Sequence, residues 1–259
     1  MKAFGRITAV LAVTALLVAG TAQAEVVQRG NLRVKVGAEL SPQRLPRVGT
    51  APIAVTVGGR IATTDGGLPP QLETLRIELN RHGHLETAGL PRCRESQIQP
   101  ASTARALAAC RAALVGQGEF SVEVVLGTQE PYPTKGRLLV FNGTYKGRPA
   151  LLGQIYSSHP FANSFVIPFT IGNLPRGRFG TVLAAKLPRA FTNWGYLTGL
   201  TMRLGRSYLH DGRRRSVLSS GCPAPEGFPG ATFPLARASF GFSTQSIGVT
   251  LTRSCKARG

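Results

Sequence analysis

The chain has 259 residues, 42% of which are hydrophobic, and it carries a formal net charge of +19 at pH 7. This length suits one large domain or two small ones. After the first 24 residues, no apolar run approaches the roughly 18–20 residues that a membrane helix needs, so we expect no transmembrane segment in the mature chain.

The chain begins with the pattern of a secretory signal peptide, residues 1–24. Lys2 and Arg6 precede an apolar stretch, Ile7–Val18, that is too short to span a bilayer, and a small-x-small motif, Ala-Gln-Ala, follows it. We therefore expect residues 25–259 to work outside the cytoplasm, secreted or in the cell envelope.

Alternating apolar and polar residues predict strands through most of the chain. The predicted strands are Leu32–Val36, Ile53–Val57, Leu72–Leu79, Phe120–Leu126, Arg137–Phe141, Ala150–Tyr156, Phe165–Ile171, Phe179–Leu187, Tyr196–Leu204, Arg215–Leu218, Phe233–Phe242 and Ile247–Thr252. Short strands broken by Gly, Pro and Asn are typical of an all-β protein. We predict an antiparallel β-sandwich, jelly-roll or immunoglobulin-like.

One short helix is predicted at Ser102–Leu114. Ser102 or Thr103 can cap its start, and Leu107, Cys110 and Leu114 fall on one face. Cys110 would then face the loop that contains Cys93.

Four cysteines, Cys93, Cys110, Cys222 and Cys255, indicate a disulfide framework in an exported chain. Three pairings are possible. We favour Cys93–Cys110 and Cys222–Cys255, because the two pairs lie in separate regions and each closes a moderate loop. A metal site is disfavoured, since there is no C-x-x-C pair and no nearby His.

Two local features bear on turns and boundaries. Asp211-Gly212 between two strand-like runs predicts a hairpin. The segment Thr128–Thr134, with Pro131 and Pro133, is a candidate domain boundary. A crossover between the sheets of one domain, residues 25–259, explains that segment equally well.

Candidate catalytic groups are few. His82 and His84 resemble a metal pair, but the composition around them predicts a turn. His210-Asp211 lacks a neighbouring nucleophile. Glu119 and Glu123, four residues apart on one strand, would lie about 13 Å apart, too far for glycoside hydrolysis.

Nucleotide-binding motifs are also missing. The sequence has no P-loop and no dinucleotide fingerprint, and we expect no metal and no cofactor.

The second half of the mature chain is strongly basic. Residues 131–259 hold 17 Lys and Arg against Asp211 and Glu226, whereas residues 25–130 hold 12 against 10 acids. Such a surface attracts polyanions. The candidate polyanion-binding residues are Lys146, Arg148, Arg176, Arg178, Arg203, Arg206, Arg213, Arg214 and Arg215. An arginine excess from codon usage is the alternative.

Trp194 and Tyr196 offer a stacking platform for a sugar or base, but we favour packing in the core for both. Tyr196 would share an apolar stripe with Leu200, Met202 and Leu204, and Trp194 would plug the end of the sandwich.

Blocks around the cysteines resemble a pattern in uncharacterised secreted proteins of actinobacteria. These blocks are Gly89–Cys93, Ala108–Cys110, Ala113–Gly116, Gly221–Pro225 and Leu251–Cys255. The resemblance covers most of the mature chain and implies an exported β-rich protein with two disulfides. It implies no activity and no binding residues.

We therefore expect a secreted, non-catalytic protein of the extracellular space or cell envelope. Its partner would be an anionic wall polymer, an acidic glycan or a membrane surface. Nothing in the sequence indicates a specific nucleic acid as the partner. The alternatives are a secreted hydrolase acting on glycans and a purely structural envelope protein.

Overall fold

The computed structural model describes residues 24–159, 161–189 and 193–258. The predicted signal peptide, apart from Ala24, lies outside the described residues. Strands make up 63% of the structure and helices 7%, which confirms the all-β class. None of the helices in the described ranges is both long and apolar enough to cross a membrane.

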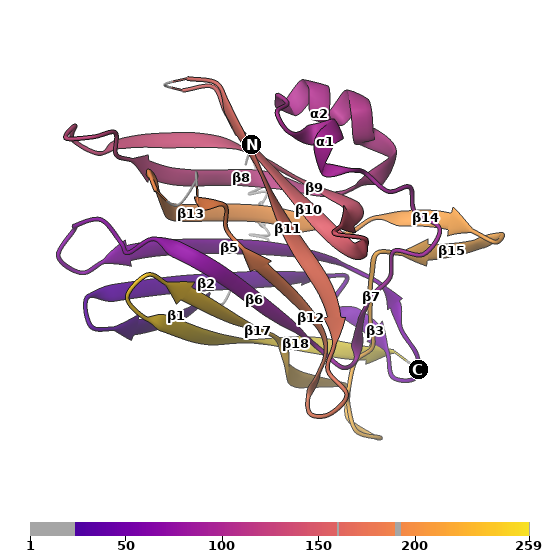
Figure 1. Ribbon diagram of the computed structural model, residues 1–259. Helices are drawn as coiled ribbons and strands as arrows, with labels where there is room; N and C mark the ends of the chain where they lie inside the picture. The colour runs from indigo at the N-terminus through magenta and orange to yellow at the C-terminus, as the bar shows by residue number, and fades with distance from the viewer. Residues whose placement is uncertain (1–23, 160, 190–192, 259) are drawn as a thin grey trace, which may run out of the picture.

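One large sheet dominates the fold (Figure 1). In sheet order its strands are β1 (Ala24–Arg29), β2 (Leu32–Ser41), β5 (Ala54–Thr63), β13 (Gly195–Leu204), β8 (Leu114–Val124), β9 (Tyr132–Tyr145), β10 (Arg148–Ser157), β11 (Asn163–Asn173), β12 (Phe179–Lys186), β6 (Leu72–Asn80), β17 (Gly230–Phe242), β18 (Ser246–Arg258) and β3 (Arg44–Pro46). Neighbouring strands are antiparallel, except that β3 runs parallel to β18.

The sheet curls until β1 lies alongside β18. The Glu25 carboxylate accepts hydrogen bonds from the Arg253 guanidinium at 2.7 and 3.2 Å and from the Thr252 amide at 2.9 Å. Arg29 donates to the Ser246 carbonyl at 3.0 Å farther along. Burial opposes ionisation of Glu25, but these hydrogen bonds and the charge of Arg253 outweigh it and lower the Glu25 pKa. Side-chain bonds therefore join the two strands across the curl.

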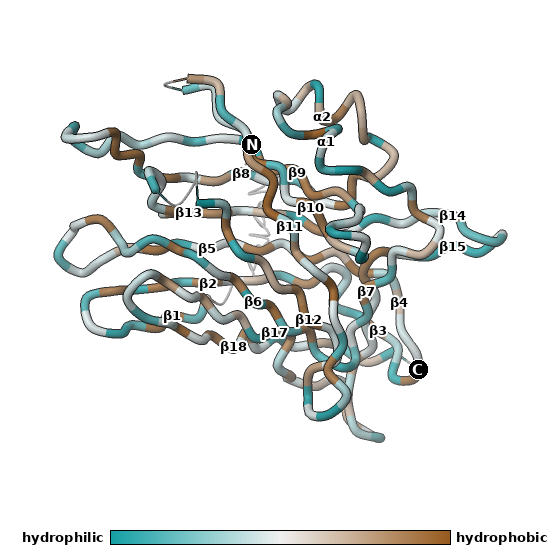
Figure 2. The backbone as a smooth tube through the Cα atoms, viewed as in Figure 1, coloured by the Kyte–Doolittle hydropathy of each residue, from teal (hydrophilic) through white to brown (hydrophobic). Residues whose placement is uncertain are grey.

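The inner face of the curl is apolar because side chains alternate along each strand. On β2 the buried residues are Leu32, Val34, Val36, Ala38 and Leu40, with exposed or half-buried residues between them. Figure 2 shows this alternation of brown and teal along the strands. Inner side chains of β2, β8, β9, β10 and β18 join one hydrophobic core.

Two short helices cover part of the outer face. They are α1 (Glu95–Ile98) and α2 (Thr103–Cys110), and the 3-10 turn η1 (Arg111–Ala113) follows α2. Ile98 and Ala106 pack with Leu139 and Phe141 of β9 in a second hydrophobic core. The outward residues of β9 and β10 are buried there, which explains why these strands read as nearly continuous apolar runs.

Both disulfides pair as favoured from the sequence. Cys93–Cys110 tethers α2 to the loop before α1, and Cys222–Cys255 joins the loop before β17 to β18. The predicted helix begins where expected, with the Ser102 hydroxyl accepting from the Arg105 amide at 3.3 Å, but β8 already begins at Leu114.

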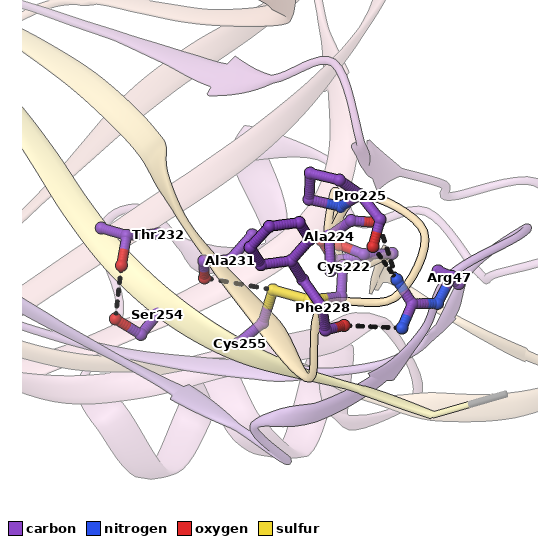
Figure 3. Close-up of a disulfide and its surroundings, with 11 residues drawn as sticks. Arg47, Cys222, Ala224, Pro225, Phe228, Ala231, Thr232, Ser254 and Cys255 are labelled. Carbon is purple, nitrogen blue, oxygen red and sulfur yellow. Dashed lines mark hydrogen bonds between the residues drawn. A yellow bond between two sulfur atoms is a disulfide. The ribbon is translucent and has the colours of Figure 1, made fainter.

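A small three-stranded sheet lies at one end of the curl, in the order β4 (Ala51–Pro52), β16 (Leu218–Ser220) and β7 (Gly83–Leu85). We call it the cap. The Cys222–Cys255 bridge ties the cap to β18 (Figure 3). Beside it, the Arg47 guanidinium donates to the carbonyls of Ala224, Pro225 and Phe228 and holds that loop.

The remaining two strands, β14 (Ser207–His210) and β15 (Arg213–Ser216), form the hairpin predicted from Asp211-Gly212. Asp211 and Gly212 both have positive φ, 52° and 69°, as the tight turn requires. The predicted strand Arg215–Leu218 is divided between β15 and β16. The segment 128–134 covers part of the loop after β8 and the start of β9, and β8 and β9 pair directly across it.

Candidate ligand-binding cavity

The curled sheet has two distinct ends. At the first, β2, β9, β11 and β13 end and β5, β10, β12 and β17 begin, next to the cap. We call it the basic end. At the second, here the open end, β5, β8, β10 and β12 end and β6, β9, β11 and β13 begin.

All nine candidate polyanion-binding residues lie toward the basic end. Lys146 and Arg148 flank the β9–β10 turn, Arg176 and Arg178 lie in the β11–β12 turn, and the others lie in the last part of β13, just after it, or on the β14–β15 hairpin. In Figure 1 the hairpin projects to the right of the sheet, and in Figure 2 it is mostly teal. The topology thus gathers residues that are scattered in the sequence.

Two of the nine have hydrogen-bond or ion-pair partners among the described residues, and Lys146 lies over the Tyr145 ring, 5.4 Å from its centroid. Arg206 donates to the carbonyls of Ala112 and Leu114 at 2.7 and 2.9 Å, and Arg215 forms an ion pair with Glu86 at 2.8 Å. The other seven side chains are exposed.

The histidine candidates lie in turns or at the surface. His82 occupies the turn after β6, as predicted, and His84 is exposed in β7. His210 lies 3.3 Å from Asp211 in the β14–β15 hairpin. Among the described residues, no three His, Cys, Asp or Glu side chains gather as metal ligands.

The two candidate glutamates do not form a pair of catalytic acids. Glu119 forms an exposed ion pair with Arg137 of β9 at 3.3 Å.

A β-bulge between Leu197 and Gly199 places Leu197 opposite Val122 and Tyr196 opposite Glu123. Tyr196 is therefore on the outer face, and its predicted place in the inner stripe is wrong. Trp194 is 48% exposed, contrary to the prediction of core packing.

The most distinctive feature of the interior is a cavity of about 240 Å³ between the two sides of the curl. Residues of eleven strands of the large sheet line it, all except β1 and β3. Many of them are only half-buried although they point inward, among them Val57, Ile77, Ile167, Phe169 and Met202. Their exposure is to this cavity, so the core of the curl is not closely packed.

Glycines help to keep this space open. Gly59 and Gly153 line the cavity from the middle of β5 and β10. A Cβ atom on Gly59 would approach no described heavy atom closer than 3.8 Å, and one on Gly153 none closer than 3.4 Å. Neither has a positive φ, so the backbone does not require glycine at these positions. The absence of side chains there leaves volume inside the curl.

The few polar residues of the lining lie mostly at the basic end. Asn80 donates to the Pro234 carbonyl at 2.7 Å and accepts from the His82 amide at 2.8 Å, and the Ser220 hydroxyl donates to the Gly221 carbonyl. Arg60 and His84 are exposed at the surface. The interior of the cavity is therefore suited to a purely apolar occupant.

A smaller hollow of about 70 Å³ continues the inner face toward the open end. Phe120 and Ile155 line both spaces, so the hollow adjoins the cavity. Neither space has an Asp or Glu in its described lining, so two-carboxylate glycoside hydrolysis gains no support from either.

Little in the sequence predicts the cavity or the hollow. Inward glycines within predicted strands were the available signal. No protein-family model, curated protein or solved structure matches this chain.

Proposed function

We propose that this protein binds an elongated apolar ligand inside the curled sheet and does so without catalysis. The observation that carries the proposal is the cavity of about 240 Å³, with its apolar lining. An apolar cavity of roughly 150 Å³ in another protein stays dry and binds benzene, so a larger one has room for a longer ligand. The work would be done outside the cytoplasm, where the signal peptide pattern and two disulfides suit the chain.

The test is to fill the cavity from within. The inner variant carries Gly59→Leu and Gly153→Leu, which place two side chains in the cavity. The matched outer variant carries Gly58→Leu and Gly248→Leu, because these glycines alternate with inward residues and a Cβ there would meet nothing within 4 Å.

The readout is the affinity for the fluorescent apolar probe N-phenyl-1-naphthylamine. We expect the inner variant to bind at least about tenfold more weakly than wild type, a loss of about 1.4 kcal/mol or more. The outer variant should bind like wild type. Circular dichroism and thermal unfolding confirm that both variants fold. Equal affinity in a folded inner variant, or no binding by wild type, would overturn the proposal.

A second candidate function rests on a separate observation, the gathering of basic residues at the basic end. We propose that the seven exposed residues there contact an anionic wall polymer, acidic glycan or membrane surface. Counterion release would make such binding fall steeply with salt.

Retention on a heparin column tests the second candidate. A variant with Lys146, Arg148, Arg213 and Arg214 changed to Ala should elute at clearly lower salt than wild type. The control changes Lys35, Lys135, Arg137 and Lys186 to Ala and removes the same charge elsewhere on the sheet. Equal shifts in both variants would mean that net charge alone causes retention and would refute a basic-end site.

A further inference from the structure

Two buried hydroxyl groups distinguish the hollow at the open end from the apolar cavity behind it. The side chains of Tyr132 and Thr134 both line the hollow, two residues apart on the same face of β9. Neither hydroxyl has a hydrogen-bond partner among the described residues, although both oxygens are buried. A buried hydroxyl left unpaired costs about 1–3 kcal/mol. A bound ligand could supply the hydrogen-bond partner that each hydroxyl lacks.

The charge around these hydroxyls limits what that partner can be. No Lys, Arg, Asp or Glu lines the hollow in the described part of the chain, and His159 is its one imidazole. Burial raises the pKa of the Tyr132 hydroxyl, which therefore stays protonated in neutral solution and able to donate. An ionised carboxylate would lose its hydration here without a cation to compensate, at a large cost, whereas an uncharged alcohol or ester oxygen needs only the hydrogen bonds that the two hydroxyls can supply.

The edge of the hollow is aromatic. Phe161 and Trp194 line it and remain 45% and 48% exposed. Large exposed aromatic side chains suit a place where an apolar ligand passes from water or a membrane into a protein.

From this geometry we propose that the ligand is a single-chain aliphatic amphiphile with an uncharged oxygen group. Its chain lies in the cavity, and its polar end sits in the hollow on the Tyr132 and Thr134 hydroxyls, having entered past Phe161 and Trp194. This inference rests on the proposed apolar-ligand function and adds the ligand's class and direction.

The test compares decan-1-ol, decanoate and n-decane as competitors of the fluorescent probe at pH 8, with wild type and a Tyr132→Phe, Thr134→Val variant. These changes remove both hydroxyls and keep the size of the side chains. Wild type should bind decan-1-ol more tightly than decanoate. In the variant, decan-1-ol should lose about tenfold in affinity, while n-decane, supplied from saturated buffer, should be unaffected.

Two results would overturn the inference. One is decan-1-ol affinity that is unchanged in the variant, and the other is tighter binding of decanoate than of decan-1-ol by wild type. Either result leaves the apolar-ligand function standing if wild type still binds the probe and the inner variant still binds it more weakly. Failure of that function itself would appear as wild type binding neither the probe nor decan-1-ol.

Thermal unfolding without ligand gives an independent readout. If the two hydroxyls served the fold, their loss would destabilise the protein. Because they are unpaired in the structure, we expect the variant to be at least as stable as wild type. A marked loss of stability would contradict the role of these groups in ligand binding.

Discussion

The basic end and the open end of the curled sheet differ in how their polar groups are used. At the basic end, internal bonds hold the loops in place, such as the three hydrogen bonds of Arg47 and the pair between Arg215 and Glu86. At the open end, the hydroxyls of Tyr132 and Thr134 are buried without a described partner. The open end has internal bonds of its own, such as those of Asp65 with Asn31 and Gly67, but its hollow holds two hydroxyls that a ligand can pair.

The two disulfides differ in where they lie relative to the cavity. Cys222 and Cys255 are both buried and tie the cap to β18 at the basic end. The other bridge, Cys93–Cys110, holds the helix on the outer face, away from the cavity. The two bridges should therefore differ in their effect on ligand binding more than in their effect on stability.

Removal of each bridge should give the largest effect on stability. The bridges span sequence separations of 33 and 17 residues. We expect Cys222→Ser with Cys255→Ser to lower the free energy of unfolding by about 3–4 kcal/mol, and Cys93→Ser with Cys110→Ser by about 3 kcal/mol. Urea titration measures both. The first variant should also bind the fluorescent probe more weakly, because the cap loosens. Equal loss of binding in the second variant would contradict a special role for the cap.

We call the side-chain contacts between β1 and β18 the seam. Weakening the seam should lower the free energy of unfolding by less than removing a disulfide does. Glu25→Gln removes the charge that Arg253 faces, and we expect a loss of about 2 kcal/mol at neutral pH. The Glu25 pKa is lowered below its ordinary value of 4.5, so its contribution is full above that pH and is lost as the pH falls through the folded-state pKa.

The measurement for this seam is thermal unfolding of wild type and variant between pH 7 and pH 3. Glu39→Gln, on an exposed position of β2, is the control and should change little. A stability difference for Glu25→Gln that stays constant over this range would show that the pair does not hold the seam by charge.

The smallest effect on stability is expected from a substitution of Asp65, in the β5–β6 loop at the open end. Hydrogen bonds from Asn31, Thr63 and the Gly67 amide lower the pKa of Asp65 from 3.8 to about 2. Its stabilising contribution is therefore present above about pH 4 and lost toward pH 2. The Tm of Asp65→Asn should lie slightly below that of wild type at pH 6 and match it near pH 2. A gap that widens on acidification would contradict this assignment.

Much of the fold could be predicted from local patterns. Alternation along Leu32–Val36 and Phe120–Leu126 indicates which side chains face inward, and the Asp211-Gly212 pair indicates the hairpin. Cysteine spacing was sufficient to favour both disulfides. These signals are local, and each depends on residues close together in the sequence.

The rest depends on contacts between distant residues. The seam needs Glu25 to meet Arg253, and strand β1 has no alternation that marks it as an edge. The bulge beside Gly199 moves Tyr196 to the outer face, which a regular period of two does not foresee. The cavity exists only because many strands curl around the same space, so no single strand reveals it.

The cavity is tested most directly by a crystal structure with 10-bromodecan-1-ol bound, because bromine gives an anomalous signal at one end of the ligand. We expect bromine inside the curl, near Gly59 and Gly153, and the hydroxyl within hydrogen-bonding distance of Tyr132 and Thr134. Bromine on the outer surface, or a ligand with its hydroxyl toward the cap, would contradict this expectation.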